Sequence, residues 1–576
     1  MDTSKTHTCD VLVVGSGAGG FCAAITAAHH GLDVILTEKA PSFGGTTALS
    51  AGVIWIPCSS QAREQGIEDT KECALRYLQN EVGNRLDTNL ANAFLDNCTK
   101  MLDFFQTHTH VRYVLAKIWP DYHPESDGAS PGGRSLMVEH FDGRLLGPQF
   151  LKLRRPLETT MIMGGMTVAR DDVPHFLRMT RSVRSAAYVT KLFARHALDR
   201  LRYPRGTRIA NGNALIGRLA MTAQEQNLPI WLSSPVTRLI LEQGAVVGAI
   251  VERDHELIEV RAKRAVILAS GGFPANEELR ARYYGHVRAG KNHHPLPPPT
   301  NTGDGLRIAQ AVGAKFSDDA VHPAAWTPVS LVPQRNGKLE PFPHFIDRGK
   351  PGIIAVNRRA HRFVNEANSY HDFVKAMFQT CEDDEKVEVF LLADHRAIRR
   401  YGLGAAPPAP GRLGPHLRSR YLVRANDIAS LAKALEIDPV ALSHTVEQFN
   451  RHANEHHDPE YGKGSNGYNH FNGDPFHQLN PCLAALSTAP FYAVRVIPGD
   501  LGTFLGLRTD ACARVLDDAQ TPIKGLYAVG NDMASFMGGN YPGAGITIGP
   551  AMTFGYIAAR HIAGVDPTES SPKGTE

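Results

Sequence analysis

The sequence Gly15-Ser16-Gly17-Ala18-Gly19-Gly20 follows a short apolar run, residues 10–14, and precedes an alanine-rich stretch, residues 21–30. This order predicts a β-strand, a glycine-rich turn and a helix. Gly15 permits the turn, Gly17 lets the backbone approach a pyrophosphate, and Gly20 lets the helix pack on the sheet. The phosphates would lie at the helix N-terminus, where free N–H groups favour negative charge. The segment therefore predicts a dinucleotide-binding β-α-β unit.

A second apolar run, residues 33–37, ends in Glu38. An acidic residue at this distance from the glycine turn meets the adenosine ribose in such units, and its carboxylate suits a free 2′-hydroxyl. The fingerprint by itself leaves FAD and NAD open.

The composition argues against nucleic-acid-binding, metal-binding and membrane-spanning classes of protein. The 576 residues carry a net charge of +3 and are 43% hydrophobic. This small charge gives no field that would recruit nucleic acid. The eight cysteines have no zinc or haem spacing, so we expect reduced thiols and no metal. No apolar run reaches 18 residues and no charged-then-apolar leader is present, which predicts a cytoplasmic location.

Residues 178–208 contain nine Lys and Arg residues between apolar ones. Two interpretations stay open: peripheral contact with an anionic membrane surface, or a solvated helix face.

The loop of residues 42–52 is rich in glycine and hydroxyl residues. It resembles the second cofactor contact of the flavoprotein family that includes fumarate reductase and the ketosteroid dehydrogenases. The resemblance implies FAD, with this loop along the ribitol and the flavin ring. Some members attach FAD through a histidine near this loop, and none stands here, so we expect non-covalent FAD.

Near the C-terminus, Asn540-Tyr541-Pro542-Gly543-Ala544-Gly545 and the following residues 547–555 are similar to the signature of the 3-ketosteroid Δ1-dehydrogenases. The resemblance implies that Asp532 contacts the ribitol and that the Tyr541 hydroxyl and the Gly545 N–H bind the substrate ketone. Two donors on one carbonyl oxygen form an oxyanion hole, which stabilises the enolate-like charge left when a neighbouring proton is lost.

Desaturation beside a ketone also needs a base for the α proton, while the β hydride passes to flavin N5. Residues 361–370 resemble the family motif that carries a catalytic tyrosine, which falls on Tyr370. A second family tyrosine, which hydrogen-bonds toward the base, corresponds to Tyr122. Since free tyrosine has a pKa near 10, a neighbour that favours the phenolate would help, and we expect an alkaline rate optimum.

The motifs and the resemblance together assign the following residues to FAD: Gly15, Gly17, Ala18, Gly19, Gly20, Glu38, Lys39, Gly45, Thr46, Thr47, Ser50, Gly52, Val236, Gly271, Asp304, Gly530, Asn531, Asp532, Gly545 and Ile548.

The fold class expected is α/β, with a Rossmann-like FAD-binding domain and an inserted α+β substrate domain. We expect the FAD-binding domain at residues 1–327 and 499–576, and the substrate domain at 328–498, where the composition changes. Within the insert, the polar residues 451–472 are expected to form a solvated loop, because His452, His456 and His457 lack a carboxylate spacing that suggests a metal.

The expected function is Δ1-desaturation of a 3-ketosteroid, with a quinone or another carrier as electron acceptor. The run of residues 502–507 is bulkier than the family pattern, which bears on the identity of the substrate more than on the desaturation reaction. The same chemistry on a simpler cyclic ketone such as 4-oxocyclohexanecarboxylate, or at the steroid Δ4 position, therefore stays open. A fumarate-reductase-like enzyme, with Arg358, Arg359 and Arg362 as carboxylate clamps, and a flavin-binding sensor without turnover are the remaining alternatives.

Overall fold

The computed structural model describes residues 6–169, 171–334 and 336–565. Within them, an eight-stranded sheet runs in the order β10-β2-β1-β13-β12-β23-β22, with β11 paired to β12. Its strands are β1 (Thr6–Val14), β2 (Val34–Thr37), β10 (Ile230–Trp231), β11 (Val236–Glu242), β12 (Ala245–Arg253), β13 (Glu256–Leu268), β22 (Arg514–Leu516) and β23 (Pro522–Ala528). The parallel pairs β2–β1, β1–β13 and β13–β23 bring their carboxyl ends to one edge.

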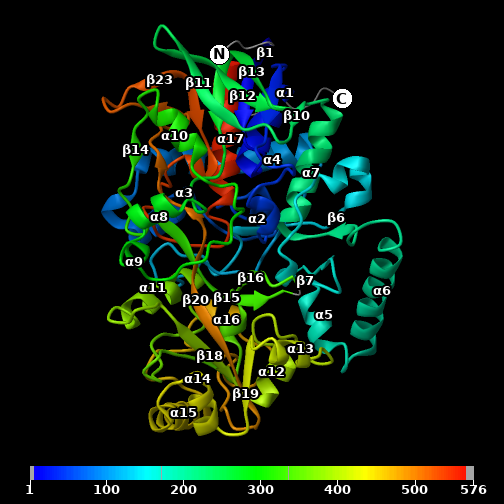
Figure 1. Cartoon of the computed structure of the whole chain (residues 1–576), viewed down its shortest axis with the longest axis vertical. Helices are drawn as coiled ribbons and strands as arrows, with labels where there is room; N and C mark the ends of the chain where they lie inside the picture. The colour runs from blue at the N-terminus through cyan, green and yellow to red at the C-terminus, as the bar shows by residue number, and fades with distance from the viewer. Residues whose placement is uncertain (1–5, 170, 335, 566–576) are drawn as a thin grey trace.

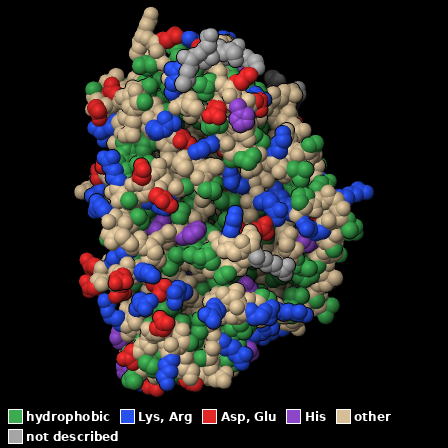
Figure 2. Space-filling view, viewed as in Figure 1, with side chains coloured by type: hydrophobic (Ala, Val, Ile, Leu, Met, Phe, Trp, Pro, Cys, Tyr) green, Lys and Arg blue, Asp and Glu red, His purple; other side chains and the backbone are tan. Residues whose placement is uncertain are grey.

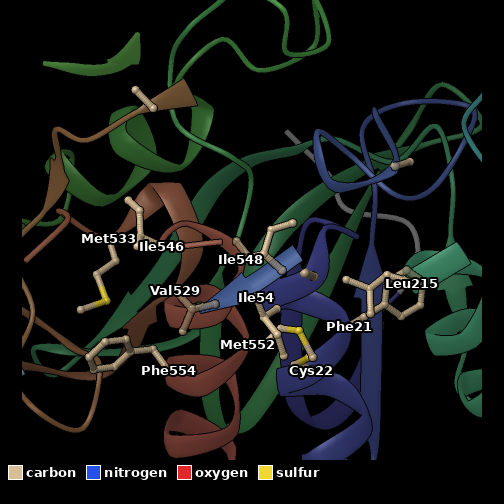
Figure 3. Packing of buried hydrophobic residues seen from close by; sticks show 14 of the residues in the cluster. Phe21, Cys22, Ile54, Leu215, Val529, Met533, Ile546, Ile548, Met552 and Phe554 are labelled. Carbon is tan, nitrogen blue, oxygen red and sulfur yellow. The ribbon is translucent and has the colours of Figure 1, made fainter. Parts of the chain in front are cut away.

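Two helices from opposite ends of the chain pack together beside this sheet, α1 (Ala18–His29) and α17 (Ile548–Ala563). Glycines allow the close approach, because a Cβ added at Gly555 would lie 2.6 Å from the Gly19 carbonyl oxygen. Figure 3 shows the buried side chains at this junction, among them Phe21, Cys22 and Met552. The C-terminal segment thus completes the core of the N-terminal unit.

A six-stranded antiparallel sheet occupies the other end of the molecule (Figure 1). Its order is β16-β15-β20-β18-β17, with β19 paired to β20. The strands are β15 (Ala324–Pro333), β16 (Leu339–Pro343), β17 (Ile353–Val356), β18 (Val389–Ala393), β19 (Leu422–Ala425) and β20 (Phe491–Thr503). Helices α14 (Ile428–Leu435) and α15 (Pro439–Asn454) bury their apolar residues in one core cluster with strand residues such as Phe390.

Several further helices and strands lie outside these two sheets. They are β3 (Val53–Trp55), β4 (Tyr113–Leu115), β5 (Ser135–Val138), α3 (Lys71–Val82), α4 (Thr88–His108), α5 (Val173–Arg178), α6 (Val183–Asp199), α7 (Asn211–Glu225), α10 (Asp304–Gln310), α11 (Tyr370–Thr380) and α16 (Gly467–Asn472). The α/β fold class is confirmed, while the domain boundaries at 327 and 498 stay a prediction.

One local expectation is wrong. The expected solvated loop of residues 451–472 instead contains buried polar residues, including Asp458, Lys463 and Asn469, because they pair with one another and with neighbouring segments. No helix in the described ranges combines the length and apolarity that crossing a bilayer requires.

Candidate active site

The glycine-rich turn forms a narrow cradle at the carboxyl ends of β1 and β13. Gly15 has a φ of +111°, and a Cβ there would overlap the carbonyl of Ala269. A Cβ at Gly45 would lie 3.6 Å from the Gly17 Cα atom, so the second cofactor loop approaches the first. These glycines let the two loops and the end of β13 approach one another closely, as a pyrophosphate cradle requires.

Hydrogen bonds lock the second loop to the first. The Ala18 N–H donates to the Thr47 hydroxyl oxygen at 3.1 Å, and the Gly44 N–H donates to Ser16 Oγ at 3.0 Å. Ser16 Oγ donates in turn to the Glu38 carboxylate, which also accepts the Ala40 N–H at 2.8 Å. These contacts fix the buried Glu38 beside the glycine turn.

A cavity opens between these loops. Nine of the residues assigned to FAD from the sequence line it: Gly15, Gly17, Glu38, Lys39, Gly45, Thr46, Val236, Gly271 and Asp304. Nine others line neither this cavity nor the next one described: Ala18, Gly19, Gly20, Thr47, Ser50, Gly52, Asp532, Gly545 and Ile548. Several of the second group hold the loops in place, as Thr47 does for Ala18.

The cavity also contains residues that the sequence motifs did not indicate, among them Ser234, Pro235 and Asn301. Asn301 Nδ2 donates to Thr46 Oγ1 at 3.0 Å and thereby joins two segments 255 residues apart. Lys39 Nζ lies 2.7 Å from the Asp304 carboxylate. Ser234, Pro235 and Asn301 lie in loops outside the glycine motifs, and only the folded chain brings them to the cradle.

A second cavity lies at the start of α17 and includes Gly530, Asn531, Thr547 and Phe504. The neighbouring Asp532 is buried, and its carboxylate accepts the Ser270 N–H at 2.6 Å and the Gly272 N–H at 2.9 Å. Asp532 therefore ties the C-terminal turn to the end of β13, and its contact with a ribitol stays a prediction.

The three tyrosines selected from the sequence form one buried cluster. The hydroxyl oxygens of Tyr122 and Tyr370 lie 3.3 Å apart. The Tyr541 ring stacks on Tyr122 at a centroid distance of 5.7 Å and meets Tyr370 at 5.1 Å. Three segments separated by more than 150 residues thus converge on one point.

Backbone contacts bind the Tyr122 segment to the Tyr541 motif. The Tyr122 N–H donates to the Pro542 carbonyl at 2.9 Å, and the Tyr77 hydroxyl donates to the same oxygen at 2.6 Å. Gly545 has a φ of +97° and packs against β3, where a Cβ would lie 2.5 Å from the Ile54 carbonyl carbon. Within the described residues, the Gly545 N–H donates to no protein acceptor, so it is a free donor beside this motif.

Burial dominates the ionisation of these tyrosines. Loss of solvation raises the pKa values of Tyr122 and Tyr370 well above the usual tyrosine value, and the neighbouring phenols add to the rise for Tyr370. Burial also raises the pKa of Tyr541, although hydrogen bonds to Tyr370 and Thr547 oppose it. The expectation of a neighbour that lowers the pKa of the base is not borne out, because Tyr122 and Tyr541 both raise the pKa of Tyr370 further.

Two further aromatic residues belong to the cluster and were not predicted. The Tyr468 ring lies 4.7 Å from Tyr122, and the Phe345 ring lies 5.1 Å from Tyr370. Tyr468 falls in the polar segment expected to be solvated, so no local pattern indicated its position. Phe504, from the bulky run of residues 502–507, packs 6.3 Å from Tyr541.

The three arginines considered as carboxylate clamps are all paired with protein carboxylates. Arg362 bonds Glu366 and Asp458, each at 2.9 Å, and is buried. Arg358 pairs with Glu388 at 2.6 Å, and Arg359 with Asp384 at 3.4 Å. The positive charges of these three arginines therefore already have protein carboxylates as partners.

Although no spacing in the sequence indicated it, ligand atoms of His452, Asp458 and Glu460 lie within 4.8 Å of one another. Both carboxylates also lie against Arg362, at 2.9 and 3.4 Å, so the guanidinium already supplies positive charge there.

Residues 10–548 match the family described as an FAD binding domain. The chain is 39% identical to a 4-oxocyclohex-2-ene-1-carboxylate 5-dehydrogenase of Sinomonas cyclohexanicum, over 99% of this chain and 96% of that protein. It is 37% identical to a 3-oxosteroid 1-dehydrogenase of Mycobacterium tuberculosis (strain ATCC 25618 / H37Rv), over 96% of this chain and 98% of that protein.

A solved structure of a 3-ketosteroid delta1-dehydrogenase from Sterolibacterium denitrificans, in complex with 1,4-androstadiene-3,17-dione, superposes with a TM-score of 0.88 at 35% identity, covering 97% of this chain and 100% of that one. Together with the dinucleotide cradle, these likenesses establish an enzyme that uses FAD to dehydrogenate a cyclic ketone. The chain belongs to the 3-ketosteroid Δ1-dehydrogenase family of FAD-dependent enzymes.

Proposed function

We propose that the enzyme desaturates its substrate between the α and β carbons of the ketone, with Tyr370 as the base. The observation that carries the proposal is the convergence of Tyr122, Tyr370 and Tyr541 in one buried cluster beside the free Gly545 N–H. In this assignment, the Tyr541 hydroxyl and the Gly545 N–H donate to the ketone oxygen. Their two hydrogen bonds stabilise the charge that develops on that oxygen as the α proton leaves.

Tyr370 receives the α proton, and the C=C bond forms as the β hydrogen departs with its electron pair. Bound FAD supplies the hydride acceptor, atom N5 of the flavin ring. The Tyr122 hydroxyl donates to the Tyr370 oxygen and holds it in position. Burial of the cluster excludes water from the developing charge.

For the substrate, we propose a 3-ketosteroid, desaturated at Δ1. The steroid named in the neighbouring structure and the oxosteroid named in the 37% identical relative support this class. A small cyclic ketone carboxylate is the second candidate, supported by the 39% identical relative and by the bulk of Phe504 beside Tyr541. A large side chain there reduces the room for a fused ring system.

The test is anaerobic mixing of the purified holoenzyme with androst-4-ene-3,17-dione and, separately, with 4-oxocyclohexanecarboxylate. Flavin absorbance is followed, and the product is identified by mass and NMR. Bleaching by the steroid with a new C1=C2 bond supports the first candidate, and bleaching by the small ketone alone supports the second. If neither ketone bleaches the flavin, and fumarate reoxidises the reduced enzyme, the proposed reaction is wrong.

We further propose that FAD is bound without a covalent link and is reoxidised by a quinone or another carrier. The loop of residues 42–52 offers no histidine for attachment. Acid precipitation should therefore release the yellow colour into the supernatant, and flavin retained in the pellet would contradict this.

Peripheral membrane contact through α5 and α6 is also proposed. Exposed apolar side chains on or next to α6 include Val183, Leu198 and Leu201, at 88%, 68% and 80% exposure. They alternate with Lys and Arg, and in Figure 1 the two helices stand at one side of the molecule. Lys and Arg side chains are frequent on this side of the face in Figure 2, as an anionic lipid surface would require.

A further inference from the structure

A histidine bridge joins the two segments that carry Tyr122 and Tyr370. His123 follows Tyr122 directly, and its Nε2 atom lies 2.8 Å from the Asp372 carboxylate. Its Nδ1 atom bonds the carboxylate of Glu81 on α3. Asp372 lies two residues beyond Tyr370 in the first turn of α11. The imidazole therefore connects the loop of one tyrosine to the helix of the other.

Each end of the bridge is fixed by further contacts. Asp372 accepts the Ser369 hydroxyl at 2.6 Å and lies 3.1 Å from Lys375 Nζ, while its N–H donates to Ser369 as the cap of α11. Glu81 also accepts the Ser126 hydroxyl. Neither carboxylate is free to follow the imidazole, so His123 is held by rigid partners on both sides.

The bridge needs a doubly protonated ring. Burial lowers the pKa of His123, but the hydrogen bonds and charges of Asp372 and Glu81 outweigh it and raise the pKa to about 10. A protonated imidazole donates from both nitrogens, whereas a neutral one donates from only one. At neutral pH, both arms of the bridge are therefore formed.

We propose that His123 is a positioning residue that holds Tyr122 at hydrogen-bond distance from Tyr370 by bridging Glu81 and Asp372. The inference rests on the proposed function, in which Tyr370 removes the α proton. The distance of 3.3 Å between the two hydroxyl oxygens is already long for an O–H···O bond. A small displacement of either segment would break that bond, and the phenolate of Tyr370 would lose its donor.

The titratable and charged groups around the bridge and the tyrosine pair come from several elements. They are Tyr77 and Glu81 on α3, Arg348 before β17, His371, Asp372 and Lys375 on α11, Tyr468 on α16, and Tyr541. His123 carries a positive charge beside two carboxylates and next to the pair. Its removal takes away that positive charge and thereby disfavours the phenolate.

The experiment is a double-mutant cycle with His123→Gln and Tyr122→Phe in the holoenzyme. His123→Gln should lower kcat roughly 10-fold with little change in KM, because the reacting groups are displaced while the ketone donors remain. The rise of kcat with pH should move to higher pH. In the Tyr122→Phe background, His123→Gln should lower kcat less than about 2-fold, since the hydrogen bond that His123 protects is already absent.

The control is His110→Gln. His110 pairs with Glu225 at 2.8 Å and is 38% exposed, close to the 33% of His123, but it lies just after α4, beside the end of α7. It should leave kcat and its pH profile unchanged. If the His123→Gln enzyme binds too little flavin to measure, Glu81→Gln replaces it, because this substitution weakens the other arm of the bridge. Its loss of kcat should likewise be smaller in the Tyr122→Phe background than in the wild-type enzyme.

An equal loss in both backgrounds, or an unmoved pH profile, would overturn the proposal. The proposed function fails separately, when Tyr370→Phe keeps full activity. If the kcat losses of His123→Gln and Tyr122→Phe are additive while activity still depends on Tyr370, the positioning role of His123 is wrong and the proposed function stands.

Discussion

At the scale of single residues, the chemistry depends on one phenol in an apolar position. Tyr370 is buried against Phe345, Tyr122 and Tyr541, and burial holds its pKa well above 10. Only a small fraction of phenolate exists at neutral pH, so the rate should rise as the pH rises toward that pKa. An alkaline optimum follows from the direction of the shift.

Tyr370→Phe should lower kcat by roughly 100-fold or more, because phenylalanine keeps the packing and removes the proton acceptor. KM should change little, since the two donors to the ketone oxygen remain. Stopped-flow bleaching of the flavin by the ketone measures this step directly. Near-full activity in this variant would exclude Tyr370 as the base.

Gly545→Ala should abolish detectable turnover or reduce it by roughly 100-fold or more. The φ of +97° strains any L side chain, and the added Cβ would meet the backbone of Ile54 at 2.5 Å, which moves the N–H away from the ketone oxygen. Gly244→Ala is the control, because its φ of +77° imposes similar strain with no atom within 4 Å of the added Cβ. Unchanged kcat for Gly545→Ala would remove this N–H from the oxyanion hole.

At the scale of elements, sequence patterns predicted the helices and strands that depend mainly on residues close together in the chain. The glycine turn, α1 and the strands β1 and β2 follow from apolar runs and glycines next to each other in sequence. The tyrosine cluster was accessible only through the family resemblance, because its three members come from distant segments. Tyr468 and the His123 bridge escaped prediction, since neither has a local pattern and both depend on how α16, α3 and α11 pack.

The element α6 carries its own prediction. The full-length protein should sediment with vesicles containing phosphatidylserine and less with phosphatidylcholine alone, and added salt should weaken the binding. Leu198→Glu combined with Leu201→Glu should reduce it, because both side chains are exposed and apolar. Leu241→Glu, on β11 and 49% exposed, is the control. Equal binding by the double variant and the control would favour the solvated helix face.

At the scale of the whole molecule, stability and rate should have different pH optima. Burial lowers the pKa of His286 and His371 to about 3 and that of His322 to about 4. A depressed histidine pKa gives stability that is present above the unfolded value of about 6.5 and is lost as the pH falls through the folded value. On the acid side, these buried neutral histidines therefore destabilise the fold as they are forced to take up protons.

His123 acts in the opposite direction. Its pKa of about 10 lies above the unfolded value, so its contribution is complete below about pH 6.5 and is lost as the pH rises through about 10. The melting temperature should therefore peak near pH 6.5, while kcat continues to rise above it. Thermal melts from pH 4 to 10 test this, and His123→Gln should flatten the alkaline side alone. The stabilisation from protonated His123 should decline as the pH rises above about 6.5. A wild-type melting temperature that climbs steadily to pH 9 would therefore show that the charged bridge contributes no stability.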